Sequence, residues 1–323
     1  MTLRNFSAHR LDLSAYGLQN VTTEPKTVPT FYFIGVSTAQ SSMNRIFPLW
    51  MAALGRPEVE LAGYDCQLHD EPARYRQIAG QIKHDPLSLG GLVTTHKLDL
   101  LAAARDLFDE LDPYAQTLDE VSCLVKTRDQ EMGDKLHGYA LDPVADGRAL
   151  QGILGDRYFE RMKGNVLCLG AGGAAAAIAL HLINRPLKGD RPRHLALVDI
   201  DQNRLDQVRE MVNRVGTDIQ FDYICNADPA ENDRLLAALT PNSVVINATG
   251  MGKDLPGSPI TDAAVFPKHG VVWELNYRGE RQFLQQAKAQ QQRRKLRIED
   301  GWTAFLYGWT SVIAKVLDVR IDS

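Results

Sequence analysis

The chain has 323 residues, a length that accommodates about two ordinary domains. Apolar residues make up 44% and charged residues 24%, which excludes collagen-like, low-complexity and mostly disordered chains. The formal net charge is -4 and no stretch collects basic residues, so we expect no nucleic-acid partner.

The cysteines and histidines form no ligand pattern. Cys66, Cys123, Cys168 and Cys225 lie far apart without a C-x-x-C spacing, and the histidines are scattered. We therefore expect no metal, no disulfide framework and a reducing compartment. The first residues lack the apolar core of a signal peptide, and no run of about 18 apolar residues occurs. These features predict a cytoplasmic protein with no membrane partner.

The first half of the chain alternates between strand and helix patterns. Residues 1–30 are polar and contain Pro25 and Pro29, so we interpret them as an N-terminal extension. Short buried strands are predicted at 31–35, from 61 onward and at 90–94, with helices at 44–54 and 72–82. Such alternation is typical of an α/β domain and predicts a largely parallel sheet.

A second alternation begins after Gly164. The pattern predicts strands at 165–169, 195–198 and 243–247, and helices from 175 to about 184 and at 203–215. This βαβ series predicts a second α/β domain of the doubly wound, Rossmann type. Residues 301–319 have helical apolar spacing with no strand after them, so we expect this last helix to pack on another domain.

A glycine-rich turn joins the first strand and helix of this second series. Gly170, Gly172 and Ala175 follow the G-x-G-x-x-A spacing of dinucleotide-binding turns, with Gly173 between them. Gly170 permits the tight turn, Gly172 lets the backbone approach a pyrophosphate, and the helix N-terminus attracts phosphate charge. A plain strand-to-helix turn is the alternative. Because an acidic residue ends the next strand, we favour a cofactor-binding turn.

That acidic residue is Asp199. A carboxylate at this position can accept hydrogen bonds from both ribose hydroxyls and would repel a 2'-phosphate, so NAD is favoured, with NADP as the alternative. Asp199 lies further from the glycines than usual, and the loop at 186–194 absorbs the difference. Arg204 could pair with such a phosphate, although a solvated position on the following helix explains it better.

A short polar stretch closes the strand at 243–247. Asn247, Ala248 and Thr249 stand at the sheet edge where ligands of open α/β sheets collect, and with Met251 we assign them to the cofactor pocket. A turn that happens to contain Asn and Thr is the alternative.

The order of these motifs resembles the shikimate/quinate dehydrogenase family, from about residue 31 to the C-terminus. The matching segments are 35–41 and 119–124 for two substrate loops, 93–97 for a lysine motif, 138–142 for an aspartate motif, the Gly170 turn, 247–249, 274–277, and the helix after 300–301. Their common order is more specific than any one segment. The resemblance identifies the chain as a divergent, shikimate dehydrogenase-like member.

The resemblance implies a domain plan and a reaction. It implies a substrate domain at 31–142 plus 283–323, an NAD(P)-binding domain at 143–282, and an active-site cleft between them. The reaction implied is hydride transfer between NAD(P) and a ring alcohol or ketone, in the family's role in aromatic amino acid biosynthesis. Lys97 and Asp142 match the catalytic pair. The expected substrate-binding residues are Ser41, Thr94, Ser122, Tyr277 and Tyr307.

Lys97 and Asp142 also fit the proton transfer that alcohol oxidation and ketone reduction require. Oxidation of a secondary alcohol needs a group that takes the hydroxyl proton, and reduction of the ketone needs the same group to return it. An ordinary lysine, with a pKa near 10.4, is a poor base at neutral pH, so desolvation must favour its neutral form. The structural alternatives are a lysine in the first turn of a surface helix and an N-cap aspartate. His96 is expected to point away or to touch a substrate carboxylate.

Several positions in the matching substrate loops depart from the family pattern. Met43 and Leu92 stand where the family has serine and asparagine, and the lysine motif is one residue shorter. The family's Gly-Ala-Val-Asn-Thr becomes residues 119–123, Ala140 and Leu141 replace Asn-Thr, and the glutamine of the final helix falls near 307–308. Lost hydroxyl partners predict a changed cyclic substrate, with shikimate itself a poor one.

The sequence leaves alternatives open. A dinucleotide-binding regulator or sensor without turnover would keep the fold but need neither Lys97 nor Asp142. An amine- or folate-directed dehydrogenase of similar layout explains fewer of the motifs. A monomer and a homodimer are equally compatible with the sequence.

Overall fold

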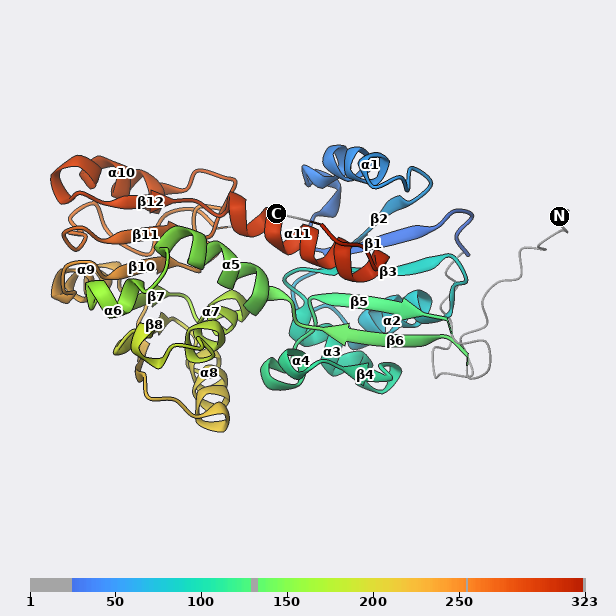
Figure 1. Cartoon of the computed structure of the whole chain (residues 1–323), viewed down its shortest axis with the longest axis horizontal. Helices are drawn as coiled ribbons and strands as arrows, with labels where there is room; N and C mark the ends of the chain where they lie inside the picture. The colour runs from blue at the N-terminus through green and yellow to red at the C-terminus, as the bar shows by residue number, and fades with distance from the viewer. Residues whose placement is uncertain (1–24, 129–132, 254, 322–323) are drawn as a thin grey trace, which may run out of the picture. The chain divides into compact units, whose positions relative to one another are not determined.

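The computed structural model describes residues 25–128, 133–253 and 255–321, and these form two compact units (Figure 1). The first unit comprises the described residues up to Leu141 and those from Trp309 onward. The second unit runs from Asp142 to Gly308. The expected N-terminal extension falls outside the described residues, except for 25–30. Of these, Thr30 already begins the first strand.

The first unit contains a six-stranded sheet in the order β2-β1-β3-β5-β6-β4. The strands are β1 (Thr30–Gly35), β2 (Glu60–Asp65), β3 (Ser88–Val93), β4 (Glu110–Leu111), β5 (Cys123–Thr127) and β6 (Lys135–Tyr139). The α-helices are α1 (Met43–Ala53), α2 (Pro72–His84), α3 (Lys97–Ala104) and α4 (Pro113–Leu118), with 3-10 turns η2 (Thr38–Gln40) and η3 (Arg105–Leu107). The predicted strands and helices of this half therefore form close to their expected positions.

The three strands predicted in this half pair in parallel, as the alternation predicts, and two unpredicted strands make the sheet mixed. β1 pairs in parallel with both β2 and β3, whereas β5 is antiparallel to β3 and to β6. The reason is that only residues 128–134 separate β5 from β6, too few for the crossover that parallel neighbours need, so the chain returns antiparallel. The missed strands β5 and β6 therefore change the topology of the expected sheet.

Both faces of the first sheet are covered. Tyr32 and Ile34 of β1 pack with α2 and α3 in one buried cluster that includes Ile78 and Leu101. Phe31 and Phe33 point to the other face, because neighbouring side chains of a strand alternate. The Trp309 ring lies 4.9 Å from that of Phe33 in an edge-on arrangement. The C-terminal part of helix α11 (Trp302–Leu317) thus returns to the first unit, as predicted.

The second unit contains a six-stranded parallel sheet in the order β12-β11-β10-β7-β8-β9. Its strands are β7 (Val166–Leu169), β8 (His194–Asp199), β9 (Gln220–Cys225), β10 (Val244–Asn247), β11 (Val271–Glu274) and β12 (Arg297–Glu299). Its helices are α5 (Asp142–Leu154), α6 (Tyr158–Met162), α7 (Gly173–Ile183), α8 (Gln202–Val215), α9 (Pro229–Ala238) and α10 (Gln282–Arg294), with the 3-10 turn η4 (Lys188–Asp190).

This strand order confirms the predicted Rossmann-type, doubly wound fold. Counted from β7, the order is 3-2-1-4-5-6 when read from β9, and the order reverses between β7 and β10. One face of the sheet packs against Leu236 of α9 and against Phe283 and Ala287 of α10. Ligands of such sheets bind at the carboxyl ends of the strands beside the reversal point. The loops after β7, β8 and β10 are therefore the place to search for a site.

Residues 283–308 belong to the second unit, although the expected substrate domain includes them. β12 pairs in parallel with β11, and Phe283 and Ala287 of α10 lie in the core beneath that sheet. The chain leaves the second unit only at Gly308, within α11. Because β12 has only three residues, its apolar pattern is too short to reveal the pairing.

Three further features concern membrane helices, metal ligands and cysteines. In the described part of the chain, no helix is long and apolar enough to cross a bilayer. The same residues contain no group of three or more His, Cys, Asp or Glu side chains arranged to hold a metal ion. The four cysteines are free thiols, and three of them are buried.

Candidate functional site

The glycine turn lies directly after β7. Gly170 has a φ of +106°, and a β-carbon at this residue would stand 2.7 Å from the carbonyl carbon of Ala248. Only glycine therefore fits here, because both the backbone conformation and the loop after β10 exclude a side chain. Gly172 is different, since a β-carbon there would meet no atom within 4 Å. Open space at Gly172 agrees with a position where a ligand approaches the backbone.

Helix α7 begins immediately after this open space. Gly172 is its N-cap residue and Gly173 its first residue. Ala175 is 1% exposed, so the first turn of the helix packs tightly against the sheet. The first N–H groups of a helix have no partner within the helix, and they carry a partial positive charge. The turn thus combines open space with an anion-attracting helix end.

Asp199 at the end of β8 is joined to this turn. Its carboxylate accepts hydrogen bonds from the Ala171 N–H, at 2.7 Å, and from the Asp201 N–H, at 3.0 Å. The side chain is buried, with 8% exposure. Asp199 therefore holds the glycine turn against β8, and each carboxylate oxygen keeps a lone pair for a further donor. Arg204 lies on α8 with an exposed side chain, 3.8 Å from the Asp201 carboxylate.

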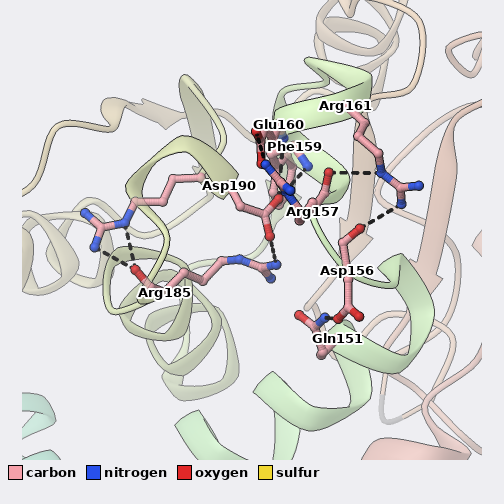
Figure 2. Close-up of polar contacts among 9 residues, drawn as sticks. Gln151, Asp156, Arg157, Phe159, Glu160, Arg161, Arg185 and Asp190 are labelled. Carbon is pink, nitrogen blue, oxygen red and sulfur yellow. Dashed lines mark hydrogen bonds and ion pairs between the residues drawn. The ribbon is translucent and has the colours of Figure 1, made fainter.

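The residues that lengthen the spacing between Gly170 and Asp199 lie at the amino end of β8, whereas the glycine turn lies at the carboxyl end of β7. Residues 186–193 precede β8, whereas the glycine turn follows β7, and the two strands are parallel. Figure 2 shows how this loop is secured: the buried Asp190 carboxylate pairs with the Arg185 guanidinium and accepts the Phe159 N–H at 2.9 Å. The extra residues therefore do not change the carboxyl ends of β7 and β8, where the glycine turn and Asp199 lie.

A buried amide and carboxyl secure the loops after β10 and β11. The Asn247 side chain donates to the Glu274 carboxylate at 2.8 Å and accepts from the Thr249 hydroxyl at 2.7 Å. Asn276 donates to the carbonyl oxygens of Thr249 and Met251, at 3.1 and 3.0 Å. The predicted residues 247–251 thus form one braced loop beside the glycine turn. Glu274 and Asn276, which brace it, were not predicted as site residues.

Glu274 is fully buried in this network. Loss of hydration raises its pKa to about 7, although hydrogen bonds from Asn276 and Asn247 act in the opposite direction. The residue directly opposite on β10 is Asn247, so strand pairing brings the two side chains together. Glu274 lies in the segment 274–277 that matches the family, but only the register of β10 and β11 reveals that Asn247 is its partner.

Two of the predicted substrate residues lie in the first unit: Ser41 follows the 3-10 turn η2 after β1, and Thr94 directly follows β3. The Ser41 hydroxyl accepts the Met43 N–H at 3.2 Å, and the Thr94 N–H donates to Ile34 at 2.9 Å. Thr95 follows with a φ of +66°, a strained conformation for a β-branched residue. Lys97 is then the first residue of α3, with a partly buried side chain.

His96, by contrast, is a core residue. Its side chain is 1% exposed, and its Nδ1 atom lies 3.0 Å from the Tyr75 hydroxyl. Burial lowers its pKa and keeps the ring neutral. The ring is directed toward Tyr75 in the core, which fits the expectation that His96 points away from the site and does not fit a contact with a substrate carboxylate.

Ser122 links the segments on either side of Lys97. Its carbonyl oxygen accepts the Val93 N–H at 2.9 Å, and its hydroxyl accepts the Leu141 N–H at 2.9 Å. The neighbouring Val121 N–H donates to the Lys97 carbonyl at 3.3 Å. Lys97, Ser122 and the residue before Asp142 are therefore tied to one part of the first unit. Asp142 itself is the first residue of α5 and opens the second unit.

The two predicted tyrosines lie in different surroundings. The centroid of the Tyr277 ring lies 4.2 Å from that of Phe305 in a tilted arrangement and 6.1 Å from that of Trp302. Trp302 is 41% exposed, so this aromatic group reaches solvent. Phe305 and Trp302 were not predicted as site residues, because their helical spacing is equally typical of buried core residues. Tyr307 is a partly buried residue of α11.

Comparisons with known proteins give a consistent result. No protein-family model matches the chain. It is 29% identical over 178 residues to a Shikimate dehydrogenase (NADP(+)) of Symbiobacterium thermophilum, which covers 54% of each chain. It is also 26% identical over 251 residues to the protein of the same name from Methylobacterium radiotolerans, covering 77% of this chain and 78% of that one. The chain thus spans about half the length of the first of these relatives.

The same architecture occurs in solved structures. The quinate dehydrogenase from Corynebacterium glutamicum in complex with NAD superposes with a TM-score of 0.69. Its sequence is 20% identical, and the superposition covers 91% of this chain and 95% of that one. At this identity the match establishes a shared fold.

Proposed function

We propose that this shikimate/quinate dehydrogenase-like chain transfers a hydride between NAD(P) and a ring alcohol or ketone of a cyclic hydroxy acid. The observation that carries the proposal is the glycine turn after β7, at the point where the strand order reverses. Gly172 leaves space that any side chain would fill, and α7 begins beside it. These residues fit a pyrophosphate.

The chain's own residues would hold a dinucleotide at three places. The first turn of α7 would bind the phosphates, and the Asp199 carboxylate would accept hydrogen bonds from the ribose hydroxyls. The braced loop at 247–251 would line the pocket beside the turn. When bound, the nicotinamide ring supplies or accepts the hydride. Because a carboxylate repels a 2'-phosphate, we favour NAD over NADP, although the curated relatives are named for NADP(+).

Lys97 and Asp142 carry the proton chemistry in this proposal. As hydride leaves the alcohol carbon, the Lys97 amine takes the hydroxyl proton, and in the reverse direction its ammonium returns that proton to the ketone oxygen. Asp142 orients the amine and the substrate hydroxyl. The proposal is supported by the order of the motifs, which both residues match within segments 93–97 and 138–142.

The substrate is expected to differ from shikimate. The Ser41 and Ser122 hydroxyls each accept a backbone N–H, so each keeps its own O–H to donate to a substrate oxygen. Met43, Leu92 and Leu141 offer no side-chain hydrogen bonds where the family pattern has polar side chains. Such a pocket favours a cyclic acid with fewer or differently placed hydroxyls.

Turnover assays with the purified chain test the function. A panel of cyclic hydroxy acids, including shikimate and quinate, is incubated with NAD or NADP while the absorbance of the reduced cofactor is recorded. We expect turnover with NAD for at least one member and slow turnover for shikimate. Ordinary enzyme rates with shikimate or quinate would contradict the altered substrate. Clear cofactor binding without any turnover would favour the regulator or sensor instead.

Two variants test the catalytic assignment. Lys97→Ala should abolish turnover while NAD binding stays near that of the wild type, and Lys288→Ala, on α10, is the matched lysine control. Loss of NAD binding in Lys97→Ala would mean that this lysine is structural. Asp142→Asn should keep the fold and cut the rate by about 10²-fold or more. A near-normal rate would remove Asp142 from the mechanism.

A further inference from the structure

A basic cavity lies at the amino ends of β7, β8 and β9. It has a volume of about 210 Å³, and an adjoining hollow of about 470 Å³ shares Lys188, Arg191 and Asp218 with it. Among the described residues, four cationic side chains and one carboxylate line the cavity: Lys163, Lys188, Arg191, Arg193 and Asp218. Three of these cations come from the loop at 186–193, whose extra length the glycine turn does not use.

The cavity lies at the opposite edge of the second sheet from the glycine turn. Lys163 precedes β7, the loop at 186–193 precedes β8 and Asp218 precedes β9, and these three strands are parallel. The amino ends of parallel strands meet at one edge of a sheet, whereas the glycine turn follows the carboxyl end of β7. A ligand in the cavity therefore binds apart from a dinucleotide at the turn.

The cavity carries a surplus of positive charge, although the chain has a formal net charge of -4. Lys163, Lys188 and Arg193 are exposed, and within the described residues no ion pair or side-chain hydrogen bond holds any of them. Like charges gathered around one hollow repel each other. An anion between these side chains would remove that repulsion.

Arg191 and its loop are held in place without the exposed cations. The Arg191 guanidinium donates to the Arg185 carbonyl at 2.8 and 3.2 Å and pairs with the Asp218 carboxylate at 3.0 Å. In the same loop, the Asp190 carboxylate pairs with the buried Arg185 guanidinium (Figure 2). A β-carbon at Gly189 would meet no atom within 4 Å, so the loop backbone there borders open space. The cavity is thus formed before any ligand binds.

The ends of two helices explain only part of this charge. Both α7 and α8 end at the adjoining hollow. Helix C-termini carry a partial negative charge that attracts cations, and Arg191 meets this need through the carbonyl oxygen of Arg185. Because no hydrogen bond joins Lys163, Lys188 or Arg193 to a carbonyl group of the described residues, these cations remain for another partner.

We propose that the basic cavity binds the diphosphate group of a small anion. Lysine and arginine are the usual partners of phosphate oxygens, and a diphosphate contacts several cations at once, whereas a single carboxylate needs only one. A nucleic acid would need an extended series of basic residues, and no stretch of the sequence provides one. The proposal does not depend on the dehydrogenase function, because it uses no residue of the glycine turn.

Calorimetric titration with inorganic pyrophosphate tests the proposal. The cavity variant combines Lys188→Gln with Arg193→Gln, and the control combines Lys288→Gln with Arg293→Gln, which removes the same two charges from exposed positions on α10. The dissociation constant for pyrophosphate should rise at least about tenfold in the cavity variant and stay unchanged in the control. Equal affinity of the cavity variant and wild type would overturn the proposal, as would an equal loss in the control. Melting temperatures verify the fold.

Gly172→Ala separates the basic cavity from the glycine turn, which also attracts phosphate. Pyrophosphate should still bind Gly172→Ala protein with the affinity that the cavity variant loses. Binding that is lost in Gly172→Ala and kept in the cavity variant would place the ion at the turn and overturn the proposal. Titration with ADP identifies the source of the diphosphate. A loss in the cavity variant for both probes supports a nucleotide, and a loss for pyrophosphate alone supports the inorganic ion.

Asp218→Asn should act in the opposite direction. It removes the carboxylate from the cavity lining while the asparagine oxygen can still accept from Arg191, so pyrophosphate should bind about threefold more tightly or better. Unchanged or weaker binding would place the ion away from Asp218 and overturn the proposal. Self-association that the cavity variant abolishes, without any binding of pyrophosphate, would assign the cavity to an acidic surface of a second copy instead.

Discussion

Substitution of the two glycines of the β7–α7 turn separates a structural role from a ligand-binding role. Gly172→Ala introduces a methyl group into open space, since no atom lies within 4 Å of a β-carbon there. The backbone at Gly172 is extended, with φ of -77° and ψ of -171°, so alanine adopts it without strain. The free energy of unfolding should therefore stay constant or rise by about 0.4 to 1 kcal/mol.

Cofactor binding should respond in the opposite direction. If a pyrophosphate lies against Gly172, the added methyl group occupies part of its space, and the affinity for NAD should fall at least about tenfold, or roughly 1.4 kcal/mol. Calorimetric titration of NAD and urea unfolding of the same preparation measure both quantities. Gly172→Ala protein that binds NAD as tightly as wild type would refute a cofactor role for the turn.

Gly170→Ala is the comparison variant for Gly172→Ala, because at Gly170 the added methyl group meets backbone atoms and not open space. Here the new β-carbon would stand 2.7 Å from the carbonyl carbon of Ala248 and 2.8 Å from its oxygen, and φ is +106°. Backbone strain and overpacking together should lower the free energy of unfolding by about 2 to 4 kcal/mol. Stability equal to wild type would mean that the loop after β10 yields easily, which would contradict its bracing by Asn247 and Asn276.

Two further predictions concern stability. Since the pKa of Glu274 in the folded chain is raised to about 7, its contribution to stability is present at acid pH and is lost as pH rises from about 4.5 to 7. Glu274→Gln should therefore gain about 2 to 3 kcal/mol relative to wild type between pH 5 and pH 8 in urea unfolding, and a constant difference would contradict the raised pKa. Thr95→Gly relieves the positive φ of Thr95 and should raise the free energy of unfolding by up to about 1 kcal/mol, whereas a loss of stability would show that the threonine side chain is needed.

Local patterns predicted most of the elements that carry the candidate site. Helix and strand periods are properties of a few neighbouring residues, so β7, α7, β8 and β10 lie where apolar spacing places them. The glycine turn was also predictable, because only glycine fits the backbone at Gly170. The colinear motifs added the resemblance to shikimate/quinate dehydrogenases, in agreement with the curated relatives.

The amino-acid sequence by itself thus determined the two α/β halves, the positions of most of their strands along the chain and the position of the nucleotide turn. Tertiary structure alone decided the antiparallel β5 and β6, the pairing of β12 with β11, and the contact of Asn247 with Glu274. It also decided that His96 is buried against Tyr75. The physical reason is distance along the chain: strand register and buried polar contacts join residues whose own neighbours carry no trace of their partners.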